Sequence, residues 1–168
     1  MNVFLTGQIQ VGKSTAIGRY LATKPRLRLG GFVTVSRPLE EGTLGVYIQP
    51  PVFEERQCTP ERLVGLRGGR RGGIPETFEN AGLALLNAPG PYDLLLMDEL
   101  GRMELRSPNF CRRILELLDG DTPVLGVVKP ESNPLLDAVR AHPRTLVLEV
   151  TEENRNEIPA LIARHLGL

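Results

Sequence analysis

The sequence predicts an α/β protein in which helices cover both faces of a mostly parallel β-sheet, a three-layer α/β/α architecture. Apolar runs typical of strands alternate along the chain with segments that have helical periodicity, and this alternation favours a parallel sheet flanked by helices. A glycine-containing turn links the first strand-like run to the first helical one, and two β-rich runs around residue 40 suggest an added β-hairpin. At 168 residues, the chain is expected to form one domain over residues 1–168.

The first half of the chain begins with a short buried strand at residues 2–6, followed by a helix at 13–23. Residues 29–37 and 43–50 are two β-rich runs joined across "PLEEG", so we expect a hairpin or neighbouring strands. Residues 51–73 show little periodicity and end in the run "RGGRRGG", and we interpret them as an irregular excursion over the surface.

The second half continues the alternation. A continuous apolar run at 94–97 predicts a strand covered on both faces within residues 91–101. Ser107 and Pro108 are typical of a helix start, and Thr151 is expected to cap the closing helix. The complete set of predicted elements is a helix at 75–88, the strand within 91–101, a helix at 107–120, a strand at 122–129, a short helix at 131–142, a strand at 144–150 and a helix at 151–168.

The stretch "GQIQVGKST", residues 7–15, matches the phosphate-loop pattern G-x-x-x-x-G-K-[ST]. Such a loop surrounds phosphates with backbone N–H groups at the positive end of the following helix. The loop residues expected to bind a nucleotide are Gly7, Gln8, Ile9, Gln10, Val11, Gly12, Lys13, Ser14 and Thr15. Lys13 is expected to reach the β- and γ-phosphates, and the Ser14 hydroxyl to ligate Mg²⁺. If Gln10 adopts the left-handed backbone region, it carries strain of roughly 1 kcal/mol relative to glycine.

A second motif, "LLLMDEL", places two carboxylates at the end of the buried strand. Asp98 is the expected partner of Ser14 in holding the magnesium ion, because phosphate-loop enzymes take such an acidic residue from a strand end. Glu99 is the candidate catalytic base, since hydrolysis also requires a water that is oriented and partly deprotonated for attack. Both motifs fall at carboxyl ends of strands, where ligands bind in sheets of this kind.

Composition narrows the class of protein. Lys plus Arg and Asp plus Glu both number 20, so no overall charge attracts nucleic acid. The cationic run at 67–73 could contact phosphates or form a solvated loop, and both readings stay open. Two separated cysteines and the absence of a long apolar segment favour a cytoplasmic protein with reduced thiols and no membrane span.

The chain resembles a known family in the segments "TGQIQVGKST", "GGFVT", "PETFENAG", "LLLMDELGRMEL" and "VTEENRNEIP". It is similar to the small nucleoside-triphosphatases that include the human cancer-related NTPase and its thermophile relatives. The resemblance runs from residue 1 to about residue 165, and "DELGRMEL" is its most specific part.

This resemblance implies a monomeric or weakly associating Mg²⁺-dependent hydrolase of ATP, GTP and other nucleoside triphosphates. It also implies a RecA-like sheet in which the 122–128 strand lies between the phosphate-loop strand and the Asp98 strand. Lys129 would then face the γ-phosphate as a sensor or transition-state cation, although a solvated strand-end lysine is an equal alternative. Arg102 stands where relatives often have lysine, so we expect its guanidinium near the nucleotide.

Two other functions remain open. A nucleoside or nucleotide kinase could use a similar phosphate loop, with "RGGRR" as the only candidate lid. A non-catalytic nucleotide-binding switch would also contain the loop, but it would have no use for Glu99 beside Asp98. Neither the preferred base nor a protein partner can be assigned from these residues.

Overall fold

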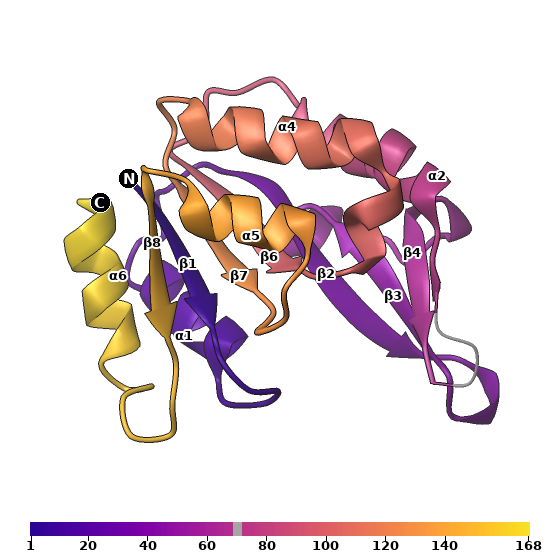
Figure 1. Cartoon of the computed structure of the whole chain (residues 1–168), viewed down its shortest axis with the longest axis horizontal. Helices are drawn as coiled ribbons and strands as arrows, with labels where there is room; N and C mark the ends of the chain where they lie inside the picture. Colours follow the sequence, from indigo (N-terminus) through magenta and orange to yellow (C-terminus); the bar gives the residue numbers. More distant parts are fainter. Residues whose placement is uncertain (69–71) are drawn as a thin grey trace.

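The computed structural model describes residues 1–68 and 72–168 and shows, within them, one eight-stranded mixed sheet with the order β5-β4-β3-β2-β6-β7-β1-β8 (Figure 1). Five neighbouring strands of this sheet, β2-β6-β7-β1-β8, run parallel to one another. Their bounds are β2 Leu29–Pro38, β6 Leu94–Leu100, β7 Val124–Val128, β1 Asn2–Thr6 and β8 Thr145–Glu149. As expected, β7 lies between β1 and β6.

The antiparallel part of the sheet extends from β2. Strand β3 (Leu44–Gln49) pairs antiparallel with β2, so the expected hairpin is present. Two further antiparallel strands, β4 (Leu63–Arg67) and β5 (Gly72–Gly73), lengthen it. The sheet is therefore mostly parallel, with a β-meander on one side.

Helices cover both faces of the sheet, and each face has its own apolar core. Helices α1 (Lys13–Ala22) and α6 (Ile158–Leu166) pack on one face over residues such as Val3, Leu5 and Leu96. On the other face lie α4 (Pro108–Asp119), α5 (Pro134–Ala141) and the helical stretch from Pro75 to Leu86, over Phe4 and Phe32 (Figure 1). Strands that alternate between two apolar cores explain the continuous apolar runs of β6 and β7.

The prediction for residues 51–73 was wrong in part. This segment contains two short 3₁₀ turns, Phe53–Glu55 and Pro60–Arg62, and strands β4 and β5. Its glycines serve close packing: a Cβ on Gly73 would lie 2.7 Å from the Met103 carbonyl oxygen, and one on Gly65 2.7 Å from the Met103 Sδ. Glycines that suggest a loop thus let two strands approach the 3₁₀ turn η5 (Met103–Arg106). Positions 69–71 of the glycine-arginine run lie outside the described residues.

Two predicted helices differ in detail. The stretch predicted as a helix at 75–88 starts at Pro75 but consists of α2 (Pro75–Thr77), a π-helical turn (Phe78–Gly82) and α3 (Leu83–Leu86). The closing helix begins at Ile158, because reciprocal bonds between Thr151 and Asn154 hold a separate turn before it. Pro159 then occupies an early helical position, which favours a start there. No helix of the described residues is long and apolar enough to cross a membrane.

Candidate active site

The phosphate loop is shaped by three residues with positive φ. Gly7, Gln10 and Gly12 have φ values of 141°, 61° and 110°. A side chain at Gly7 would also clash, since its Cβ would lie 2.5 Å from the Val150 carbonyl oxygen. Gln10 is the one non-glycine residue with positive φ in the described parts of the chain; it therefore carries the strain anticipated from the sequence. The loop runs from the end of β1 into α1, as the motif requires.

Lys13, the first residue of α1, folds over the loop that precedes it. Its ammonium group donates hydrogen bonds to the carbonyl oxygens of Gly7 at 2.7 Å and Gln8 at 2.6 Å. Burial lowers the pKa of this lysine, while the nearby carboxylates of Glu99 and Asp98 raise it. The ammonium group is thus held at the mouth of the loop.

Ser14 and Asp98 lie against each other although they are 84 positions apart. The serine hydroxyl donates to the Asp98 Oδ1 at 3.4 Å, and the Thr34 hydroxyl donates to the Asp98 carbonyl oxygen at 3.3 Å. Burial raises the pKa of the Asp98 carboxyl to about 6, against the lowering effect of the Ser14 hydrogen bond. The structure therefore brings together the two predicted metal-binding residues.

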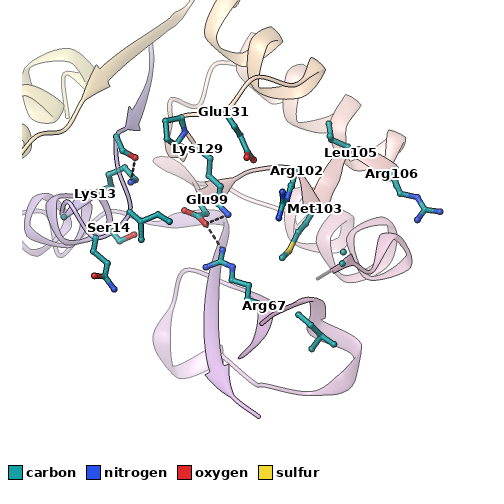
Figure 2. Close-up of a pocket in the computed structure, with 18 of the residues that line it drawn as sticks. Lys13, Ser14, Arg67, Glu99, Arg102, Met103, Leu105, Arg106, Lys129 and Glu131 are labelled. Atoms are coloured by element: carbon teal, nitrogen blue, oxygen red, sulfur yellow. Dashed lines mark hydrogen bonds and ion pairs between the residues drawn. The ribbon is translucent and has the colours of Figure 1, made fainter. Parts of the chain in front are cut away.

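Glu99 turns to a different set of partners. Its Oε1 lies 2.9 Å from Nη2 of Arg67 and 3.4 Å from Nζ of Lys129, and its side chain is 24% exposed. Arg67 comes from β4 and Lys129 follows β7, so three parts of the sheet meet at this carboxylate (Figure 2). Lys129 lines the same cavity as the phosphate loop, and its contact with a γ-phosphate stays a prediction. Arg67 is the first residue of the cationic run whose role the sequence left open.

Glu104 was not recognised from the sequence. It is 3% exposed, and its Oε2 accepts a hydrogen bond from the Gly101 backbone N–H at 3.1 Å. Burial raises the pKa of this carboxyl to about 7, with Lys129 acting to lower it and Glu99 to raise it. An acidic residue within "DELGRMEL" was the available signal, but the sequence does not reveal that its side chain turns inward.

A cavity of about 1200 Å³ joins these groups. The predicted residues that line it are Gly7, Ile9, Gln10, Gly12, Lys13, Ser14, Thr15, Glu99, Arg102 and Lys129. Three predicted residues do not line the cavity. Val11 packs into the core, Asp98 contacts Ser14, and the Gln8 carbonyl accepts a hydrogen bond from Lys13. Figure 2 shows Glu99 between Lys13 and Ser14 on one side and Arg102 and Met103 on the other.

Comparisons with known proteins agree with this geometry. The model of a family described as NTPase matches residues 2–163. The chain is 30% identical to a nucleoside-triphosphatase THEP1 from Methanosarcina barkeri, over 97% of this chain and 95% of that protein.

Two solved structures have the same fold. A crystal structure of THEP1 from Aquifex aeolicus matches with a TM-score of 0.77 and 22% identity, over the whole of both chains. The solution structure of a human cancer-related nucleoside triphosphatase matches with a TM-score of 0.65 and 26% identity, over 97% of this chain and 95% of that one. From its loop, its paired carboxylates and these matches, the chain belongs to the NTPase family that includes the THEP1 nucleoside-triphosphatases.

Proposed function

We propose that this protein hydrolyses ATP, GTP and other nucleoside triphosphates to the diphosphate and phosphate, in a reaction that depends on Mg²⁺. The observation that carries the proposal is the position of Glu99. It follows Asp98 directly, lies in the same cavity as the phosphate loop and is held by two cations. A protein that only binds nucleotides needs no such carboxylate.

The loop supplies the binding site for the triphosphate. Backbone N–H groups between Gly7 and Lys13 and the N-terminus of α1 favour phosphate oxygens. The Lys13 ammonium already points into the loop, so a phosphate oxygen would take the place of the carbonyl groups it now contacts. Contacts of this kind do not distinguish one base from another, which supports a broad range of nucleoside triphosphates.

The donor groups present fit Mg²⁺. The Ser14 hydroxyl, from α1, and the Asp98 carboxylate, from β6, are hard oxygen ligands. Among the described residues, no group of three or more His, Cys, Asp and Glu side chains could enclose a metal. A site with one carboxylate suits magnesium, which keeps several waters and binds substrate phosphates. When bound, the ion would neutralise charge on the phosphates.

Glu99 would act as the general base that orients and deprotonates the attacking water. Its contacts with Arg67 and Lys129 fix the carboxylate in place, and they put two positive charges where the γ-phosphate gains negative charge in the transition state. Lys129 is thereby assigned the role of a transition-state cation. Arg102, in the wall of the same cavity, would add a further phosphate contact.

The test is the Glu99→Gln variant, which keeps the size of the side chain and removes the base. Triphosphate binding should persist, while Mg²⁺-dependent phosphate release falls by a factor on the order of 10² or more. Glu152→Gln, an exposed glutamate beyond β8, is the matched control and should retain full turnover.

Phosphate release should be measured for several triphosphates, with and without divalent metal and with candidate nucleosides as acceptors. Full turnover by Glu99→Gln, or equal turnover of the wild type without metal, would contradict the mechanism. Transfer of phosphate to an added nucleoside, in place of release, would identify a kinase.

A further inference from the structure

The cavity continues past Glu99, away from the phosphate loop. Its volume of about 1200 Å³ exceeds the range of roughly 300–1,000 Å³ typical of small-molecule sites. In Figure 2, Lys13 and Ser14 lie on one side of Glu99, and Met103, Leu105 and Arg106 lie on the other. We call the part lined by Leu66, Pro75, Met103, Leu105 and Arg106 the distal chamber.

A triphosphate on the loop would leave the distal chamber free, and this step rests on the proposed function. If Glu99 activates the attacking water, the γ-phosphate lies beside it. The phosphate chain then runs back over the loop, and the nucleoside leaves on the side away from Glu99. A second molecule could therefore bind in the distal chamber at the same time.

Apart from Arg106, the residues that line the distal chamber are apolar, and tertiary packing brings them together. Leu66 belongs to β4, Pro75 to α2, and Met103 and Leu105 to η5. Gly65 and Gly73 allow η5 to lie directly on the strands, because any Cβ there would come within 2.7 Å of Met103. Leu105 remains 40% exposed. These walls suit a ligand with a flat or apolar body.

The charges of the cavity favour an anion. Its lining contains five cationic side chains, namely Lys13, Arg67, Arg102, Arg106 and Lys129, against the two carboxylates Glu99 and Glu131. Lys13 has loop carbonyls as partners, and Arg67 and Lys129 have Glu99. Within residues 1–68 and 72–168, neither Arg102 nor Arg106 has an ion pair or a side-chain hydrogen bond, unlike Arg28, which pairs with Asp93 at 2.7 Å. Arg106 is thus available to bind an anionic group by a paired contact.

We propose that the distal chamber binds a small phosphomonoester with a flat or apolar body, held by Arg106 at its phosphate and by Leu66, Pro75 and Leu105 at its body. This ligand binds together with the triphosphate, on the other side of Glu99.

The experiment is calorimetric titration of the full chain, saturated with a non-hydrolysable triphosphate analogue and Mg²⁺. The probes are a nucleoside monophosphate, phenyl phosphate and inorganic phosphate. We expect the nucleoside monophosphate and phenyl phosphate to bind to the saturated protein. Inorganic phosphate should bind at least tenfold more weakly, because it has no organic group to contact the apolar walls. Arg106→Ala should weaken binding by about tenfold, since it removes a charged hydrogen bond, and Arg106→Lys should restore part of it.

Arg112→Ala, on the exposed side of α4 and outside the cavity, is the matched control and should bind the probes like the wild type. Three results would overturn the proposal: no binding to the saturated protein, binding that Arg106→Ala leaves unchanged, or inorganic phosphate binding as tightly as the larger probes. Phosphate release from the triphosphate by the same preparation, without a probe, tests the proposed function separately. Arg106→Ala should retain this basal release, so failure of the second site is distinguishable from failure of the hydrolase.

Discussion

The phosphate loop and the surroundings of Glu99 line the same cavity, yet one is local in sequence and the other is not. The loop takes its shape from φ values at Gly7, Gln10 and Gly12, and Lys13 bonds to carbonyls five and six positions earlier. Glu99 is instead held by Arg67 and Lys129, which lie 32 and 30 positions away in opposite directions along the chain. The loop can therefore take its shape from neighbouring residues, whereas the surroundings of Glu99 form only when β4, β6 and β7 are assembled in one sheet.

The same contrast separates Asp98 from Glu99, although they are neighbours. Asp98 lies against α1, where burial raises its carboxyl pKa to about 6. Glu99 faces the cavity and two cations. The pairing of β6 with β7 shifts in register between Asp98 and Leu100, so Glu99 stands outside the regular ladder, and its side chain faces the cavity while that of Asp98 faces Ser14. In the mechanism that we propose, Asp98 would serve the metal ion and Glu99 the attacking water.

The largest effect is expected on the loop side of this comparison. Lys13→Ala removes the one side-chain charge that the loop itself supplies, and turnover should fall on the order of 10³-fold, as for other lost transition-state donors. Steady-state phosphate release measures the effect, with Lys24→Ala after α1 as the control. If Lys13→Ala kept more than a tenth of wild-type turnover, the loop would not be the site of the reaction.

On the Glu99 side, Glu104→Gln should change how stability depends on pH. Burial raises the Glu104 carboxyl pKa from 4.5 to about 7, so between these values the folded protein keeps a proton that the unfolded chain releases. The wild type therefore loses stability as the pH rises through this window, by about 3 kcal/mol at most, and the loss is complete above pH 7.

A glutamine cannot ionise, so Glu104→Gln should gain stability relative to the wild type between pH 5 and pH 7.5. Urea unfolding of both proteins without metal measures the difference, and the raised pKa of Asp98 is common to both and cancels. A difference in unfolding free energy that stays constant over this range would show that Glu104 titrates normally.

Arg67→Ala tests whether the contact from β4 matters for the reaction. The variant removes one of the two cations that hold the Glu99 carboxylate. Turnover should fall by about tenfold, because Arg67 positions this carboxylate and stabilises charge in the transition state. The affinity for the triphosphate should stay nearly unchanged. Measurement of kcat separately from triphosphate binding decides this. Arg26→Ala, an exposed residue outside the cavity, is the control. An equal loss in affinity and in turnover would place Arg67 on the bound substrate instead.

The smallest effect is expected at Gln10. Its φ of 61° disfavours a side chain, so Gln10→Gly should raise the unfolding free energy by up to about 1 kcal/mol and leave turnover intact. Thermal unfolding with a phosphate-release assay checks both. Gly12→Ala, at φ 110°, is the opposite change and should destabilise the protein. A destabilised Gln10→Gly would mean that the Gln10 side chain contributes contacts that outweigh its backbone strain.

Most of the fold could be predicted from the sequence, and so could the phosphate loop and the paired carboxylates of the site. The alternation of apolar strands and helices indicated the parallel sheet, and strict spacing in "GQIQVGKST" and "MDE" indicated the loop and the paired carboxylates. These signals are local, because strand ends, tight turns and helix starts are set by neighbouring residues. The glycine-arginine run misled the prediction, since a glycine such as Gly73, which permits close packing, looks the same in sequence as one that permits a turn.

The sequence by itself determined that a phosphate loop follows the first strand and that two carboxylates end a buried one. Only the tertiary structure decided that Asp98 meets Ser14, that Arg67 and Lys129 meet at Glu99, that Glu104 is buried and that the cavity extends past Glu99. The physical reason is that each of these contacts joins separate elements. Their distances depend on strand order and helix packing, which local spacing does not encode.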